Sequence, residues 1–236
     1  MKPQRTIAAV LCAVALALGG CASSADPMKH IPPGAASAIF AGGCFWCVEF
    51  DFESLPGVYE AESGYTGGHS PNPTYYQVAM GGTGHTEAVR VYYDPARVSY
   101  AQLVDYFWHH IDPTVRNRQF CDRGEQYRSG IYWQNDAERE AAEASRDALL
   151  GSGRFPTIYT EIAPAGAFYR AEETHQDFYR KNPLRYAYYR NACGRDARVA
   201  QVWGTPPAGA LPAQAQGSAP ATAAPELPSS GREPPE

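Results

Sequence analysis

The C-terminal part of the chain limits what can fold, because it lacks the residues that build a core. From Thr205 to Glu236 there is no aromatic residue, and eight of the twenty prolines of the chain fall there among many alanines. Such a segment cannot bury enough apolar surface to offset the entropy lost on ordering, so we expect residues 205–236 to be disordered. Residues 21–35 are mostly small or polar and include Pro32-Pro33, which predicts a flexible tether. The folded unit is therefore predicted at residues 36–204.

The first twenty residues have the pattern of an export signal. Lys2 and Arg5 precede an uninterrupted apolar run from Ile7 to Leu18, which is shorter than the roughly 20 residues that a membrane span needs. The segment Leu18-Gly19-Gly20-Cys21 resembles the lipobox of bacterial lipoproteins, in which the cysteine becomes the acylated first residue. An ordinary secretory signal that contains a cysteine is the alternative. We expect residues 1–20 to be a lipoprotein signal peptide and Cys21 to hold the exported chain at the periplasmic or extracytoplasmic face of a membrane.

Composition excludes some partners and leaves one question about the cysteines open. The formal charge is −5 and no block of basic residues occurs, so nucleic acid is not expected as a partner. Cys12 would leave with the signal and Cys21 would carry lipid, which leaves Cys44, Cys47, Cys121 and Cys193 in an oxidising compartment. Four cysteines allow three disulfide connectivities, and the sequence does not choose among them.

Hydrophobic patterns between residues 36 and 204 predict intermixed strands and helices. Strands are predicted at residues 38–41, 58–63, 86–93, 126–133 and 157–163, a loop at 64–73, and helices at 44–55, 136–150 and 172–181. A further helix is capped by Ser99 and carries an apolar stripe to Ile111, and Asn135 with Glu138 makes a capping-box-like start for the helix at 136–150. Short connections between strands and helices indicate a mixed α and β class, with helices packed on a sheet.

Cys44 stands where a short apolar run ends at Gly42-Gly43 and a helix is predicted to begin. A thiol is a nucleophile only as the thiolate, and the unpaired amides of a helix start lower the pKa of a cysteine there. These features favour a reactive Cys44. The alternative is a buried structural cysteine, and the pair Cys44-x-x-Cys47 alone suits redox centres and zinc sites alike.

Five motifs follow one another between residues 38 and 204. They are Gly43-Cys44-Phe45-Trp46-Cys47-Val48-Glu49, Gly64-Tyr65-Thr66-Gly67-Gly68, Asn72-Pro73-Thr74-Tyr75, Gly84-His85-Thr86-Glu87-Ala88-Val89 and Asp122-Arg123-Gly124-Glu125-Gln126-Tyr127-Arg128-Ser129. In content and order they resemble the A-type peptide methionine sulfoxide reductases. The resemblance implies a two-layer α/β sandwich with a ferredoxin-like core, and reduction of the S epimer of methionine sulfoxide in oxidised proteins or as the free amino acid. It also implies no bound cofactor, and thioredoxin or a similar dithiol as the reductant. We expect a monomer.

Reduction of a sulfoxide needs a thiolate that attacks sulfur and an acid that protonates the oxygen. By the resemblance, Cys44 attacks and Glu87 is the acid, while Tyr75 and Tyr127 donate hydroxyl hydrogen bonds and Asp122 lines the same site. A glutamate that donates a proton at neutral pH needs a raised pKa, which burial beside aromatic rings would supply. On residue type alone, Glu87 would be a solvated strand carboxylate and the two tyrosines ordinary core or surface residues.

The resemblance also concerns the residues around Cys44. Phe45 and Trp46 would form an apolar wall for the methyl group of the substrate. After oxygen transfer, the sulfenic acid on Cys44 would condense with a second thiol. Cys193, in a loop-like stretch that resembles the C-terminal recycling position of the family, is the first candidate for this resolving cysteine. Cys47, where many family members carry glycine, is the second, and Cys121 is the third.

Two rival functions use the same cysteines. A lipoprotein without enzymatic activity could bind one structural zinc through all four thiolates, although Cys121 and Cys193 are far apart in sequence. A general thiol-disulfide exchange protein could use the Cys-x-x-Cys pair, but this leaves the motifs around Glu87 and the tyrosines unexplained. The histidines have no His-x-x-x-His spacing, and we do not expect them to bind metal.

Overall fold

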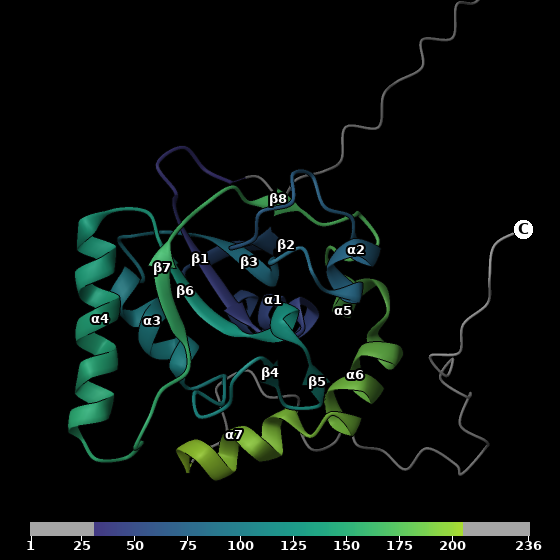
Figure 1. Ribbon diagram of the computed structural model, residues 1–236. Coiled ribbons are helices and arrows are strands. Elements are labelled where there is room, and N and C mark those ends of the chain that lie inside the picture. Colours follow the sequence, from purple (N-terminus) through teal and green to yellow (C-terminus); the bar gives the residue numbers. More distant parts are fainter. Residues whose placement is uncertain (1–30, 205–236) are drawn as a thin grey trace, which may run out of the picture. The chain divides into compact units, whose positions relative to one another are not determined.

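A six-stranded sheet forms the centre of the computed structural model, which describes residues 31–204 (Figure 1). The strands are β1 (Ala36–Gly42), β2 (Val58–Thr66), β3 (Thr86–Tyr93), β6 (Ser129–Trp133), β7 (Glu161–Pro164) and β8 (Tyr169–Arg170), and a separate two-stranded ladder pairs β4 (Arg118–Gln119) with β5 (Asp122–Arg123). The helices are α1 (Phe45–Glu53), α2 (Tyr75–Met80), α3 (Tyr100–Trp108), α4 (Asp136–Gly151), α5 (Phe178–Lys181), α6 (Pro183–Ala192) and α7 (Arg195–Trp203), with a 3₁₀ turn at Glu125–Tyr127.

The strand order β7-β6-β1-β3-β2-β8 contains the ferredoxin-like arrangement. Strand β3 pairs antiparallel with both β1 and β2, and β1 pairs antiparallel with β3 and β6. The connection from β1 through α1 to β2, and that from β3 through α3 to β6, therefore each link parallel strands with one strand between them. The parallel strand β7 and the antiparallel strand β8 extend the two edges. The predicted class, an α+β sandwich with a ferredoxin-like core, is confirmed.

The main core lies between the sheet and helices α1 and α3. Successive residues of a strand point to opposite faces, so Phe40 of β1 meets the helices, where its ring lies 4.8 Å from that of Phe52 and 5.2 Å from that of Phe107. Its neighbour Ile39 faces the other side of the sheet, in a small cluster that includes Tyr132. Both residues are buried, so β1 is apolar on both faces.

A buried charge cluster fastens the C-terminal helices to α1. Asp51 of α1 lies 2.8 Å from a guanidinium nitrogen of Arg190 in α6 and 3.2 Å from one of Arg195 in α7. Burial alone would raise the pKa of Asp51, but the two arginines outweigh it and the pKa is lowered. Arg195 also donates to the carbonyl of Gly42 at 3.0 Å, next to the turn that precedes Cys44. These contacts hold α6 and α7 beside the start of α1.

Several predicted boundaries and caps are confirmed. Ser99 caps α3 in a capping box with Gln102, and the side chain of Asn135 accepts the backbone N–H of Glu138 at the start of α4. Strand β3 has the predicted bounds.

Other predicted elements are wrong in extent. The helix predicted at 172–181 is helical only at Phe178–Lys181, because Gln176 bonds the backbone of β2 at Ser63 and Asp177 adopts a positive φ of 51°. The loop predicted at 64–73 begins later, since residues 64–66 pair with β3. The strands predicted at 126–133 and 157–163 begin at Ser129 and Glu161. Helices α2, α6 and α7 were not predicted, and Cys193 is the C-cap of α6 rather than part of a loop.

Three predicted segments fall wholly or largely on residues that the structure does not describe. The signal peptide at residues 1–20, the lipid-bearing Cys21 and the tail at 205–236 lie outside the described residues, as does most of the tether at 21–35. Between residues 31 and 204, no helix combines the length and the hydropathy needed to cross a membrane.

Candidate active site

Cys44 lies at the junction between β1 and α1, as its neighbours predict. Gly43 adopts a φ of +86°, and a side chain there would come within 2.6 Å of Cβ of Gln119, so the turn requires glycine. Cys44 is the N-cap of α1, and its carbonyl accepts the backbone N–H of Val48. The turn directs the Cys44 side chain into the protein, where 6% of the residue is exposed.

Cys44 and Cys47 form a buried, hydrogen-bonded pair of free thiols. Burial raises the pKa of Cys44 well above its ordinary value, so the prediction that the helix start lowers it is wrong for the resting protein. The hydrogen bond from Cys44 lowers the pKa of Cys47, and the nearby Arg195 and Arg190 lower it further. Cys47 is therefore the more readily ionised of the two thiols, and Cys44 donates the hydrogen bond between them.

Glu87 of β3 is buried and faces the start of α1. Its Oε2 accepts the backbone N–H of Phe45 at 3.0 Å, so this amide is directed to Glu87 rather than to the Cys44 sulfur. Burial raises the pKa of Glu87 to about 8, and the charges of Asp122 and Cys47 act in the same direction. Glu87 is therefore predominantly protonated at neutral pH, as the sequence-based argument for an acid required.

One small cavity brings these groups together. It measures about 90 Å³ and is lined by Cys44, Phe45, Trp46, Tyr75, Glu87, Asp122, Tyr127 and Tyr189. Seven of these eight residues were predicted as site residues. We refer to it as the active-site cavity.

The hydroxyl groups that face this cavity keep their protons at neutral pH. Burial raises the pKa of Tyr75 to about 12, and it also raises the pKa of Tyr127 and Tyr189. The hydroxyl of Tyr189 donates to Oδ2 of Asp122 at 2.7 Å. Burial raises the pKa of Asp122, whereas this hydrogen bond opposes the rise. Tyr75 and Tyr127 can thus offer hydrogen bonds to an oxygen atom in the cavity, whereas the proton of Tyr189 is donated to Asp122.

Tyr189 is a site residue that the sequence did not reveal. It lies in α6, a helix that also contains Tyr186 and Tyr188, of which the first is buried and the second is exposed. The three tyrosines differ only in the direction in which their side chains leave the helix axis, and the helix itself was not predicted. Its position four residues before Cys193 is the one local signal.

The apolar wall of the cavity is held by stacking and by one hydrogen bond. Trp46 stacks on Phe178 with ring centroids 3.6 Å apart, and its indole N–H donates to Nδ1 of His175 at 3.2 Å. Burial lowers the pKa of His175, which keeps that nitrogen available as an acceptor. The ring of Phe45 lies 6.3 Å from that of Tyr75. Phe45 and Trp46 thus occupy the walls, where the resemblance expected them.

The other two cysteines are bonded to each other. Cys121 and Cys193 form a disulfide, and Cys121 is exposed. In this form Cys193, the first candidate for the resolving cysteine, has no free thiol to offer Cys44, whereas Cys47 contacts Cys44 directly. The bond also means that the four thiolates of the rival zinc site are not available together.

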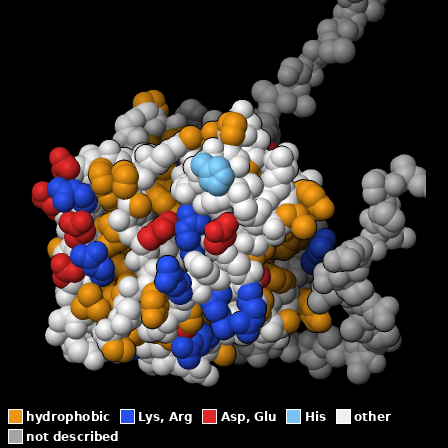
Figure 2. Space-filling model, in the orientation of Figure 1, with side chains coloured by type: hydrophobic (Ala, Val, Ile, Leu, Met, Phe, Trp, Pro, Cys, Tyr) orange, Lys and Arg blue, Asp and Glu red, His pale blue; other side chains and the backbone are white. Residues whose placement is uncertain are grey.

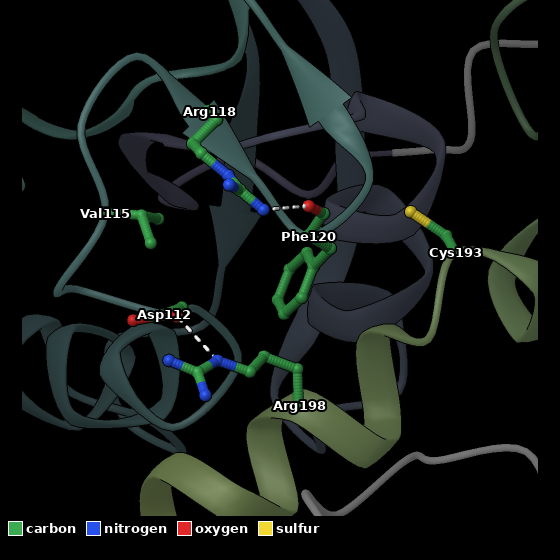
Figure 3. Close-up of a pocket in the computed structure, with 6 residues that line it drawn as sticks. All are labelled: Asp112, Val115, Arg118, Phe120, Cys193 and Arg198. Carbon is green, nitrogen blue, oxygen red and sulfur yellow. Dashed lines mark hydrogen bonds and ion pairs between the residues drawn. The ribbon is translucent and has the colours of Figure 1, made fainter.

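A second cavity, of about 400 Å³, lies beside the disulfide. Cys193 lines one side of it, and Figure 3 shows the guanidinium groups of Arg118 and Arg198 directed into it. Arg198 is paired with Asp112 at 2.7 Å, while Arg118 donates to the carbonyl of Phe120 at 2.9 Å. The cavity beside the disulfide therefore carries two guanidinium groups and the carboxylate of Asp112.

A buried thiol pair beside a protonated carboxyl group suits one class of protein, a thiol-dependent reductase that removes oxygen from a small polar group. A sequence model of the family described as "Peptide methionine sulfoxide reductase" matches residues 36–206. The chain is 48% identical over 195 residues to "Peptide methionine sulfoxide reductase MsrA 2" of Caulobacter vibrioides, covering 83% of this chain and 97% of that protein. It is 51% identical over 167 residues to the MsrA of Listeria welshimeri, covering 70% and 94%.

Solved structures of methionine sulfoxide reductases are also similar to this chain. The methionine sulfoxide reductase A of Corynebacterium diphtheriae superposes with a TM-score of 0.58 at 39% identity, covering 65% of this chain and 77% of that one. Mxr1 of Saccharomyces cerevisiae in reduced form gives 0.58 at 34% identity, covering 67% and 88%. The chain belongs to the peptide methionine sulfoxide reductase family, and its activity is that of a peptide-methionine (S)-S-oxide reductase.

Proposed function

We propose that this protein repairs oxidised methionine in exported proteins, with Cys44 as the nucleophile and Glu87 as the acid. The observation that carries the proposal is the proximity of the two groups. A free thiol and a carboxyl group with a pKa of about 8 line the same cavity, which has room for little more than one side chain. Attack and protonation can therefore occur on one S=O group.

In the first step, Cys44 gives its proton to the thiolate form of Cys47 and attacks the sulfur of the sulfoxide. Glu87 donates a proton to the oxygen, with hydrogen bonds from Tyr75 and Tyr127. The S–O bond of the substrate breaks and a new S–O bond forms on Cys44, so the products are methionine and a sulfenic acid. Glu87 regains its proton from solvent. The hydrogen bond between the two sulfur atoms supports Cys47 as the acceptor, because it places the Cys47 sulfur within reach of the Cys44 proton.

In the second step, Cys47 attacks the sulfenic acid on Cys44. A disulfide forms between them and water leaves, so the thiol pair has supplied the two electrons that reduced the sulfoxide. The hydrogen bond between the two thiols supports Cys47 as the resolving residue.

Re-reduction then passes through the second cysteine pair. Thiols at Cys121 and Cys193 would attack the disulfide between Cys44 and Cys47, freeing both and forming their own disulfide. Such a transfer leaves Cys44 and Cys47 as free cysteines and Cys121 bonded to Cys193. The structure has the cysteines in this state. A thioredoxin-like dithiol protein would reduce the exposed disulfide from outside.

We further propose that the protein is a membrane-anchored lipoprotein. The support is the sequence of residues 1–21, with its positive start, its apolar run and the lipobox-like Cys21. Metabolic labelling with a radioactive fatty acid tests this, and a Cys21→Ser variant that is still labelled would contradict it.

The catalytic proposal is tested with the two epimers of a methionine sulfoxide peptide and dithiothreitol. We expect the S epimer to be reduced by the wild type and not by Cys44→Ser. Reduction that survives the loss of Cys44, or that is confined to the R epimer, would overturn the proposal. Stoichiometric zinc in the reduced protein, or disulfide exchange without sulfoxide reduction, would favour the two rival functions.

A further inference from the structure

Large hydrophobic side chains exposed within residues 31–204 are concentrated on two short helices. Tyr76 and Met80 of α2 are 71% and 69% exposed, and Leu184 and Tyr188 of α6 are 87% and 69% exposed. Two other large hydrophobic residues with high exposure in this range, Leu150 and Tyr159, lie elsewhere. We call the four residues of α2 and α6 the apolar rim.

Each of these helices also supplies one wall of the active-site cavity. Tyr75 of α2 and Tyr189 of α6 line the cavity, while their chain neighbours Tyr76 and Tyr188 face solvent. Each helix therefore has one tyrosine in the site and the next one on the outer surface. Figure 1 shows α2 and α6 on the same side of the molecule, and Figure 2 shows hydrophobic side chains along that edge.

A continuous row of rings connects the two helices past the cavity. The ring centroid of Tyr75 lies 4.2 Å from that of His175, His175 lies 5.8 Å from Trp46, and Trp46 lies 5.8 Å from Tyr189. Tyr76 and Tyr188 thus flank opposite ends of one aromatic surface. The rings that line the active-site cavity and the apolar rim thus belong to the same two helices.

The two rim residues of each helix form a small contact surface, because they are four positions apart in the sequence. Tyr76 and Met80 are four residues apart, as are Leu184 and Tyr188, so each pair lies on one side of its helix. Scattered single hydrophobic residues on a surface need no explanation, whereas a group of them beside a site marks a place where another molecule binds.

The size of the active-site cavity indicates what that molecule is. At about 90 Å³ the cavity takes the end of one side chain. When a methionine sulfoxide within a polypeptide reacts, the residues before and after it must lie on the surface around the cavity, to which α2 contributes Tyr75 and α6 contributes Tyr189. Tyr76, Met80, Leu184 and Tyr188 are exposed on the same two helices.

We propose that the apolar rim binds the residues on either side of the oxidised methionine, so that extended segments with large apolar neighbours are the preferred substrates. The inference rests on the proposed function and adds to it the class of polypeptide that is repaired. Segments of this kind lie in the cores of folded proteins and become accessible when oxidation or export leaves them unfolded.

The test compares three substrates that carry the S epimer: N-acetyl methionine sulfoxide, a five-residue peptide with serine neighbours, and the same peptide with leucine neighbours. With dithiothreitol as reductant, we expect the wild type to give a kcat/KM for the leucine peptide about fivefold to tenfold above that for the serine peptide, the size of one or two partly buried apolar contacts. The double variant Tyr76→Ser/Leu184→Ser should lower this ratio to about one and leave the rate with the N-acetyl amino acid unchanged.

Tyr159→Ser serves as the matched control, because Tyr159 is a half-exposed tyrosine outside α2 and α6. It should keep the wild-type ratio. An unchanged ratio in the rim variant overturns the inference while the proposed function stands, whereas no reduction of any substrate by the wild type overturns the proposed function. A wild-type dimer that the rim variant converts to a monomer, with the peptide preference intact, would assign the rim to a second copy of the chain and also overturn the inference.

Discussion

Replacing Glu87 by glutamine should stabilise the protein at neutral pH while it slows catalysis. Burial raises the pKa of Glu87 from 4.5 to about 8, and each pKa unit is worth about 1.4 kcal/mol, so ionising this carboxyl in the folded protein costs about 5 kcal/mol more than in water. Because the folded pKa lies above the unfolded one, the contribution of Glu87 to stability is complete below pH 4.5 and is lost as the pH rises through about 8.

At pH 7 the unfolded chain has ionised Glu87 and the folded protein has not. The resulting loss of stability is about 3 kcal/mol relative to pH 4.5. Glutamine has nearly the same size, carries no charge at either pH, and can still accept the N–H of Phe45 through its amide oxygen. Glu87→Gln should therefore exceed the wild type by about 3 kcal/mol in free energy of unfolding at pH 7, and by almost nothing at pH 4.5.

Urea unfolding of the wild type, Glu87→Gln and Glu140→Gln at a series of pH values measures this difference. Glu140 is an exposed residue of α4, so its variant should follow the wild type throughout. In parallel, kcat of the wild type should fall as the pH rises through about 8, and that of Glu87→Gln should be about 100-fold lower at neutral pH because the proton donor is lost. A stability gap that is the same at pH 4.5 and pH 7, or a variant less stable than the wild type at pH 7, would refute the assignment of Glu87 as a carboxyl group held protonated by burial.

Other consequences of the structure can be measured separately. Cys47→Ser should accumulate sulfenic acid on Cys44 after one turnover without reductant, detected by mass after dimedone labelling; labelling no greater than in the wild type would remove Cys47 from the resolving role. Asp51→Asn should lower the free energy of unfolding by about 3 to 5 kcal/mol in urea, because it removes the carboxylate that the buried guanidinium groups of Arg195 and Arg190 share, and only Arg190 keeps another, that of Asp196; a loss below about 1 kcal/mol would contradict that account. Ser99→Ala should remove about 1 kcal/mol through the lost cap of α3, and Ser99→Asp, which can still cap the helix, should restore most of it.

Sequence patterns identified those parts of the fold in which local and tertiary preferences agree. The capped starts of α3 and α4 and the alternation of β3 depend on neighbouring residues, and they were predicted closely. The segment before α5 was not, because Gln176 bonds the backbone of a distant strand in place of continuing a helix. No local pattern can reveal a hydrogen bond between residues so far apart in sequence.

In the candidate site, too, some features could be predicted from the sequence and others could not. The motifs around Cys44, Glu87 and Tyr127 were recognised as a set, and the structure brings them to one cavity. The protonation of the thiols could not be predicted, since it depends on burial and on the direction in which the amide of Phe45 points. The pairing of Cys121 with Cys193 depends on how α6 packs, and the sequence left three connectivities open.

The four cysteines of residues 31–204 form a buried pair and a surface pair. This arrangement also sets how many sulfoxide groups the protein can reduce before it needs an external reductant. Each pair stores two electrons, so a fully reduced molecule holds enough for two methionine sulfoxides before any reductant arrives, whereas the form with Cys121 bonded to Cys193 holds enough for one. With the proposed electron transfer between the pairs, the second pair would act as a reserve in a compartment where reducing partners are scarce. During a brief oxidative burst the protein could then reduce methionine sulfoxide without waiting for a reductant, and its disulfides would be reduced afterwards.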